Sequence, residues 1–206
     1  MKKRLTIPTI LGMIFLVVGV FAGVLLLRNV QMFRIGASGE ATHKDIRISN
    51  ITDNSVSISW TTDKASSGFI NWGTSQGGID KIVQEDVNGQ KYFSHLISLS
   101  GLEAKTKYYF KISSNGTLYD NVGIPWQFTT GDKIGTSNKS ILLSGNVISA
   151  TGTPESKALV YVTIGGYTLS TLTSDTGNFV FQLGSARSQD LNNFASIDMS
   201  NTLIQI

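Results

Sequence analysis

Residues 55–62 read SVSISWTT, and residues 107–112 read KYYFKI. In the first stretch Val56, Ile58 and Trp60 alternate with serine and threonine, and the second stretch alternates lysine or tyrosine with apolar residues in the same way. A period of two, with apolar side chains on one side and polar ones on the other, is typical of an antiparallel strand with one buried face. The two stretches therefore predict an all-β fold.

The same alternation recurs along the chain in short runs that end at turn residues. The predicted strands of the first set are 45–51, 55–62, 67–73, 81–87, 92–100, 107–114 and 126–130. Those of the second set are 141–148, 158–164, 167–173, 178–183 and a last stretch near 195–206. Short strands at this spacing predict two tandem antiparallel β-sandwiches of the immunoglobulin-like type.

The N-terminal region differs from the rest, because residues 8–27 form an uncharged and largely apolar run. A helix of that length rises about 30 Å, which matches the hydrocarbon core of a bilayer. Basic residues in the tail 1–7 favour a cytoplasmic N-terminus. The sequence thus predicts a single-pass membrane protein that contacts lipid through residues 8–27 and exposes its β domains outside the cytoplasm. The alternative is a cleaved signal peptide with its cleavage site near residues 37–39.

Charge and cysteine content exclude several classes of protein. Five of the 17 basic residues and none of the 14 acidic ones lie within residues 1–34, so the remainder has a net charge of −2. That balance argues against a nucleic-acid partner, which needs a basic face. The absence of cysteine excludes disulfides and thiolate metal sites. In an exported protein it is more typical of bacteria or archaea, so we interpret the Asn-x-Ser/Thr triplets at Asn50, Asn115 and Asn138 as chance matches.

These features predict a domain order. A juxtamembrane linker (28–44) leads to a first domain (45–132), a polar linker (133–140) and a second domain (141–206). The sequence closes on residues 202–206, of which Leu203, Ile204 and Ile206 are apolar. We therefore expect this last strand to pair within its own sheet, to meet a strand of another subunit, or to lead into further modules. We favour the last alternative, in which the second domain is incomplete.

Four stretches carry a family resemblance: SVSISWTTD (55–63), SSGFINWGTS (66–75), LSGLEAKTKYYFKI (99–112) and WQFTTGD (126–132). Together they resemble a fibronectin type III domain, in the form found ahead of the catalytic domain of purple acid phosphatases. The matching positions are Trp60, Leu102, Thr106, Tyr108 and Phe128-Thr129-Thr130. The resemblance covers about residues 43–132. It implies a scaffold in which the Tyr108 hydroxyl bonds upstream backbone while its ring fills the core.

The stretch SGNVISATGTPESKALVYVTIGGYTLSTLTSDTGNFVFQL (144–183) is similar to the carboxypeptidase regulatory-like, transthyretin-like fold. This resemblance covers about residues 141–206. Gly165-Gly166 suits a two-residue hairpin, where positive φ is needed. Asp175 is expected to cap a tight turn with its side chain.

No catalytic, metal-binding or cofactor-binding motif is present in the sequence. Of the two histidines, we place His43 in the linker and His95 on a strand, in a structural or surface role. Asp53, Asp63 and Asp80 fall in predicted turns, where such residues bond local backbone. A second group of polar residues (Asp120, Asn121, Asp132 and Asp175) has no calcium-loop spacing. We therefore expect neither an enzyme nor a cofactor.

Two tryptophans, Trp72 and Trp126, are the weak candidates for a binding surface, because aromatic residues dominate contacts with partners. Their alternative role is core packing. We expect a non-catalytic, membrane-anchored surface protein whose modules act as adhesin-like binding surfaces or spacers for protein or cell-wall glycan. The alternative is a structural subunit of an envelope machine or filament assembled through its transmembrane helix, in which Gly19 and Gly23 would allow close helix packing.

Overall fold

The computed structural model describes residues 12, 18–19, 41–85 and 89–197. The chain divides into two compact units, Met1–Gly39 and Glu40–Ile206. The three described residues of the first unit are α-helical. Within the described ranges there is no helix of the length and apolarity that a bilayer crossing needs. Apart from these three residues, the predicted span 8–27 lies outside the described residues, as do residues 198–206.

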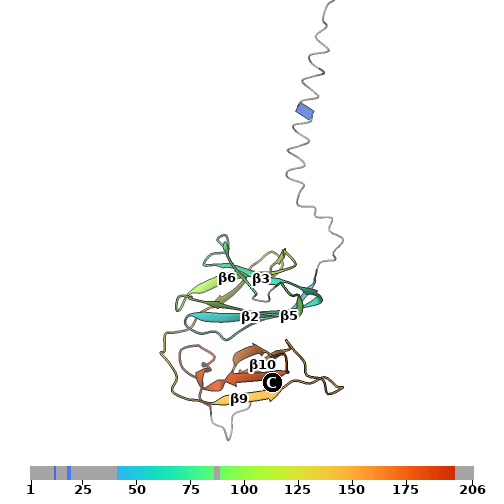
Figure 1. The fold of residues 1–206 in the computed structure, drawn as a ribbon. Helices are drawn as coiled ribbons and strands as arrows, with labels where there is room; N and C mark the ends of the chain where they lie inside the picture. Colours follow the sequence, from blue (N-terminus) through green and yellow to red (C-terminus); the bar gives the residue numbers. More distant parts are fainter. Residues whose placement is uncertain (1–11, 13–17, 20–40, 86–88, 198–206) are drawn as a thin grey trace, which may run out of the picture. The chain divides into compact units, whose positions relative to one another are not determined.

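The described part of the second unit is all-β and antiparallel. We call residues 41–132 the first module and residues 141–197 the second module. In its described residues, 41–85 and 89–132, the first module has eight strands: β1 (His43–Ser49), β2 (Ser55–Ser66), β3 (Gly68–Gly73), β4 (Lys81–Gln84), β5 (Tyr92–Ser100), β6 (Lys107–Ser114), β7 (Thr117–Tyr119) and β8 (Trp126–Thr129). One sheet has the order β1-β2-β5, and the other has the order β4-β3-β6-β7, with β8 also paired to β6. The two sheets form the layers of a sandwich (Figure 1).

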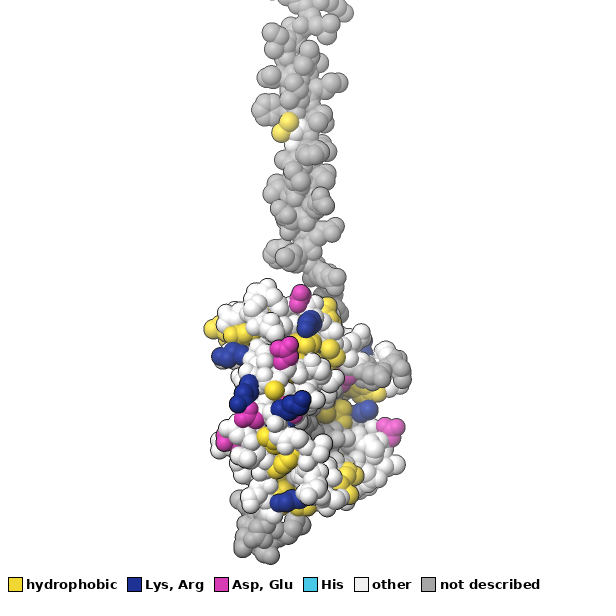
Figure 2. Space-filling view, turned by 90° about the vertical axis from the view of Figure 1, so that its left-hand side faces the viewer, with side chains coloured by type: hydrophobic (Ala, Val, Ile, Leu, Met, Phe, Trp, Pro, Cys, Tyr) yellow, Lys and Arg dark blue, Asp and Glu magenta, His cyan; other side chains and the backbone are white. Residues whose placement is uncertain are grey.

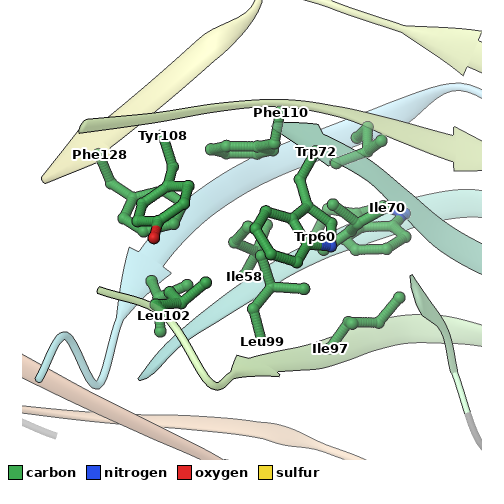
Figure 3. Packing of buried hydrophobic residues seen from close by; sticks show 12 residues of the cluster. Ile58, Trp60, Ile70, Trp72, Ile97, Leu99, Leu102, Tyr108, Phe110 and Phe128 are labelled. Carbon is green, nitrogen blue, oxygen red and sulfur yellow. The ribbon is translucent and has the colours of Figure 1, made fainter. Parts of the chain in front are cut away.

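The core of the first module lies between these sheets. Its fully buried residues include Ile58 and Trp60 from β2, Ile70 from β3 and Phe110 from β6. Apolar side chains occupy alternate positions in β2 and β6, as the sequence predicts, so each of these strands turns an apolar face toward the opposite sheet. Figure 3 shows the Trp60 and Trp72 side chains within this core.

The corner tyrosine has the position that the resemblance implies. The Glu103 N–H donates a hydrogen bond of 2.8 Å to the Tyr108 hydroxyl. The Tyr108 ring is buried and stacks on Phe128 at 5.4 Å between ring centroids (Figure 3). The side chain therefore links the loop before β6 to the core.

The second module has four strands among the described residues: β9 (Leu142–Asn146), β10 (Leu159–Ile164), β11 (Tyr167–Leu172) and β12 (Asn178–Gln182). They form two antiparallel pairs, β10-β11 and β12-β9, around a shared apolar core. A 3-10 turn, η1 (Leu183–Ser185), follows β12. As predicted, Gly165 and Gly166 make the β10-β11 turn with φ of 54° and 85°.

One predicted cap in the second module is wrong. Instead of Asp175, Ser174 holds the turn before β12: its Oγ accepts from the Asn178 N–H at 3.2 Å, and its carbonyl accepts from the Gly177 N–H. The Asp175 carboxylate instead accepts a hydrogen bond from the Ser156 hydroxyl at 3.1 Å. A serine hydroxyl satisfies the same backbone donor as an aspartate would, so the sequence pattern predicted the turn but not the residue that caps it.

Most predicted strands are present with bounds that differ from the prediction by one or two residues, and the larger differences are few. Strand β1 begins at His43, so this histidine lies on a strand and not in the linker. Strand β7 was not predicted, and no strand occurs at residues 195–197, where the last predicted strand begins. Between β7 and β8 the chain leaves the sheet at residues 120–125, and Val122 at its tip has φ of 54°. The Lys111–Asp120 ion pair (2.9 Å) fixes the start of this excursion.

Candidate functional site

A buried polar cluster surrounds His95 inside the first module. Its Nδ1 lies 2.9 Å from the Glu85 carboxylate, and its Nε2 lies 2.9 Å from the Ser66 hydroxyl. Its ring also stacks on Trp60 at 4.9 Å. A neutral imidazole with its proton on Nδ1 donates to Glu85 and accepts from Ser66. The three side chains thus have the hydrogen-bond order of a serine-histidine-carboxylate triad.

Burial prevents this cluster from acting on a substrate. His95 and Ser66 have no exposed surface, and the Glu85 side chain is 6% exposed. A nucleophile needs an open approach and donors for the developing oxyanion. The cluster instead satisfies polar groups at the edge of the sandwich, where Glu85 also accepts a 3.5 Å bond from the Leu96 N–H. His95 therefore has a structural role, one of the two roles the sequence suggested for it.

Gly68 makes room for this cluster. A Cβ atom at residue 68 would lie 2.8 Å from His95 Nδ1, 2.8 Å from the Trp60 ring and 3.2 Å from the Glu85 carboxylate. The Gly68 carbonyl also accepts a hydrogen bond from the Glu85 N–H at 3.1 Å. The strand approaches the imidazole and the indole this closely only because residue 68 has no side chain.

The two candidate tryptophans are less open than a binding surface requires. Trp72 is 9% exposed and belongs to the core, with Lys81 Nζ 4.6 Å from its ring centroid. Trp126 is half-buried, and its ring stacks on Phe110 at 5.8 Å. Core packing, the alternative role that the sequence offered for Trp72, describes its position. On the face in Figure 2 the charged side chains of both signs are interspersed.

The aspartates expected to bond local backbone have long-range partners in two cases. The Asp63 carboxylate accepts a 2.7 Å bond from the Thr42 N–H, across 21 residues. The Asp53 carboxylate binds Arg187, across 134 residues. Among the described residues no cluster of three or more histidine, cysteine or acidic side chains is placed to hold a metal ion.

Arg187 joins the two modules. Its guanidinium is buried, with Nη2 donating to Asp53 Oδ1 at 2.6 Å. Nη1 donates to the carbonyls of Asp132 (2.5 Å) and Leu191 (3.1 Å). Asp53 and Asp132 belong to the first module, and Arg187 and Leu191 to the second. One cation thus satisfies acceptors from both modules, as a buried arginine requires.

Asn50 makes a second connection. Its amide oxygen accepts from the Ser170 N–H at 3.0 Å, and its amide nitrogen donates to the Ser170 carbonyl at 2.9 Å. Its own backbone N–H donates to the Thr168 carbonyl at 2.9 Å. Asn50 has φ of 51°, a conformation that asparagine tolerates better than most residues. The side chain therefore pairs with β11 in the way a neighbouring strand would.

Serines on the outer face of β2 complete the contact between the modules. The Ser59 and Tyr161 hydroxyls lie 2.8 Å apart, and Arg47 lies over the Tyr161 ring at 4.4 Å. The Tyr167 hydroxyl donates to the Ile51 carbonyl at 3.0 Å, and burial raises the pKa of this phenol to about 12. The sequence predicted Ser57 and Ser59 on a polar outward face, yet both are buried.

A comparison with known protein families supports the β-sandwich fold of the first module. Residues 43–131 match the family model of the purple acid phosphatase N-terminal domain, which supports the fibronectin-like β-sandwich. This domain is the non-catalytic part of those enzymes. No curated protein matches the chain. Among solved structures, the chain is similar to the sensor domain of the anti-sigma factor RsgI4 of Pseudobacteroides cellulosolvens. That similarity has 15% identity and a TM-score of 0.32, over 45% of this chain and 96% of that one.

Proposed function

We propose that the chain is a non-catalytic, membrane-anchored surface protein whose two β modules act as one rigid binding or spacer arm outside the cytoplasm. The observation that carries the proposal is the direct docking of the modules through Arg187 and Asn50. Domains of one chain move relative to each other unless their interface restrains them. Here a buried ion pair and a paired amide fix one orientation, which suits a part that holds a partner at a set distance.

The second module fits this proposal as a carboxypeptidase regulatory-like domain. The paired strands β10-β11 and β12-β9, with a glycine hairpin and a tight turn before β12, support that assignment. In this proposal residues 8–27 anchor the arm in the bilayer, and the partner is a protein or a cell-wall glycan. The uncharged run of residues supports the anchor.

The test uses the full-length chain in bacterial cells. We expect it in the membrane fraction after an alkaline carbonate wash, and we expect protease added to intact spheroplasts to digest the β modules. A protein released by the wash, or protected from the protease, contradicts the proposal. We further expect calorimetry of the detergent-solubilised chain to show one unfolding transition for both modules. Two separate transitions contradict the rigid arm.

A further inference from the structure

An open crevice of about 540 Å³ lies at the junction of the two modules. The turn 52–55 between β1 and β2 forms one wall, and the linker 133–139 forms another. Gln182, Ser185 and Arg187 of the second module close the third side, together with Phe194. The crevice exists only when both modules are folded and docked, because no single module supplies all of its walls.

The walls of the crevice are fixed by specific contacts. Arg187 lines the crevice and binds Asp53 on one wall and the Asp132 carbonyl beside the linker. The Leu183 N–H donates a 2.7 Å bond to the Ile141 carbonyl, which joins the end of the linker to η1. A Cβ atom on Gly184 would lie 2.0 Å from the Lys139 carbonyl, so only glycine permits this approach. The crevice is therefore largely pre-formed, as ligand sites usually are.

The lining is polar and carries an excess of positive charge. Hydroxyl and amide side chains predominate on it: Thr52, Asn54, Ser55, Thr136, Ser137, Gln182 and Ser185. Lys133 and Lys139 are exposed, and no carboxylate of the described residues forms an ion pair with either. Asp53 already neutralises Arg187. Two unpaired cations thus lie in a domain region whose net charge is otherwise negative.

We infer that this crevice binds an acidic oligosaccharide. The hydroxyl and amide groups match the many donors and acceptors of a sugar, and the two lysines match its carboxylates. The half-buried Phe194 offers a ring to the C–H face of a pyranose. An acidic peptide lacks the hydroxyl groups that such a lining satisfies, and a neutral sugar leaves the lysines unpaired. The inference rests on the proposed function and names the ligand class of the binding arm.

The test is calorimetric titration of the full-length chain in mild detergent with three probes: trigalacturonate, maltotriose and triglutamate. We expect trigalacturonate to bind most tightly of the three probes, and we expect its binding to weaken as the salt concentration rises. The double variant Lys133→Gln/Lys139→Gln should weaken its binding about tenfold. The matched control is Lys64→Gln/Lys91→Gln, which removes the same charge from two exposed lysines outside the crevice. This control should bind trigalacturonate as the unmodified chain does.

A second pair of variants tests the hydroxyl groups. Thr136→Val and Ser185→Ala should weaken the binding of trigalacturonate and leave the binding of triglutamate unchanged. Equal losses in the two lysine double variants overturn the inference, as does tighter binding of triglutamate or of maltotriose. Absence of binding to all three probes by a chain with an unchanged unfolding curve also overturns it. That result leaves the rigid arm intact, since membrane fractionation and the single unfolding transition test the arm separately.

Discussion

Nη2 of Arg187 and Oδ1 of Asp53 lie 2.6 Å apart although 134 residues separate them in the chain. The arginine side chain is 3% exposed and the aspartate side chain 22%. The arginine also binds two backbone carbonyls, and its removal leaves the Asp53 carboxylate and the Asp132 carbonyl without this donor, while the Leu191 carbonyl keeps a hydrogen bond from the Asp132 N–H. This pair is therefore the contact on which the docking of the two modules most depends.

Arg187→Met should lower the free energy of unfolding by about 3 kcal/mol, the lower end for a broken buried ion pair, since Asp53 keeps some solvent. Chemical denaturation of the full-length chain measures this loss. The control is Lys111→Gln, which breaks the more exposed Lys111–Asp120 pair and should cost less than about 1 kcal/mol. Equal effects of the two substitutions would show that Arg187 does not hold the modules together.

Asn50→Ala should destabilise the docked modules by about 2–3 kcal/mol. The substitution removes the hydrogen bonds to Ser170 and places an alanine, whose Cβ is strained there, at φ of 51°. Asn50→Gly removes the same bonds without the backbone strain, so its loss should be smaller. Thermal unfolding of the unmodified chain, Asn50→Gly and Asn50→Ala gives their order of stability. If the glycine variant is the least stable, backbone strain at residue 50 is not part of the cost.

Trp60→Ala should cost about 3–5 kcal/mol, because the side chain is fully buried against His95 and Ile58. That is a large share of the roughly 5–15 kcal/mol that stabilises a domain. We expect the first module to unfold near growth temperature, as measured by circular dichroism. The control is Phe93→Ala in β5, where the residue is 59% exposed, and this substitution should change stability by less than about 0.5 kcal/mol. An unchanged curve for the tryptophan variant would refute the assigned inward face.

Tyr167 should make the docked modules sensitive to alkali. Burial raises the pKa of its phenol to about 12, opposed in part by the positive charge of Arg187. The unfolded chain releases this proton near pH 10, so the stabilisation of up to about 2–3 kcal/mol is fully present below pH 10 and lost as the pH rises toward 12. The near-ultraviolet absorbance of tyrosinate should show a late step that Tyr167→Phe removes. A late step that persists in this variant belongs to another tyrosine.

Strand positions follow from the sequence where alternation is long and uninterrupted. Strands β5 and β6 have the predicted bounds, because a buried side chain recurs at every second position over most of each strand. Strand β7 has three residues between a glycine turn and Asp120, too few for a period of two to be recognised. Strand β2 continues past the predicted end to Ser66 because its pairing with β5 shifts register after Thr61.

Docking of the modules could not be predicted, for a physical reason. Ser57 and Ser59 alternate with core residues, a pattern typical of a strand face in solvent. Serine is small enough to be covered by another sheet and polar enough to bond it, so the pattern is the same in either setting. Arg187 and Asn50 carry no local motif, since the contacts that join the modules, to Asp53 and to Ser170, each span more than 100 residues. The sequence shows that Lys133 and Lys139 lie in the linker, but it does not show which residues form the other walls of the crevice.

The excursion at residues 120–125 affects how two copies of the chain can pair at high protein concentration. It interrupts the outer rim of the β6 sheet, leaving β7 and β8 as separate pieces of three and four residues with Val122 protruding between them. A second copy that approached this rim would find no continuous row of amide and carbonyl groups to join. The break in the strand therefore opposes edge-to-edge pairing between two copies of the chain along this rim.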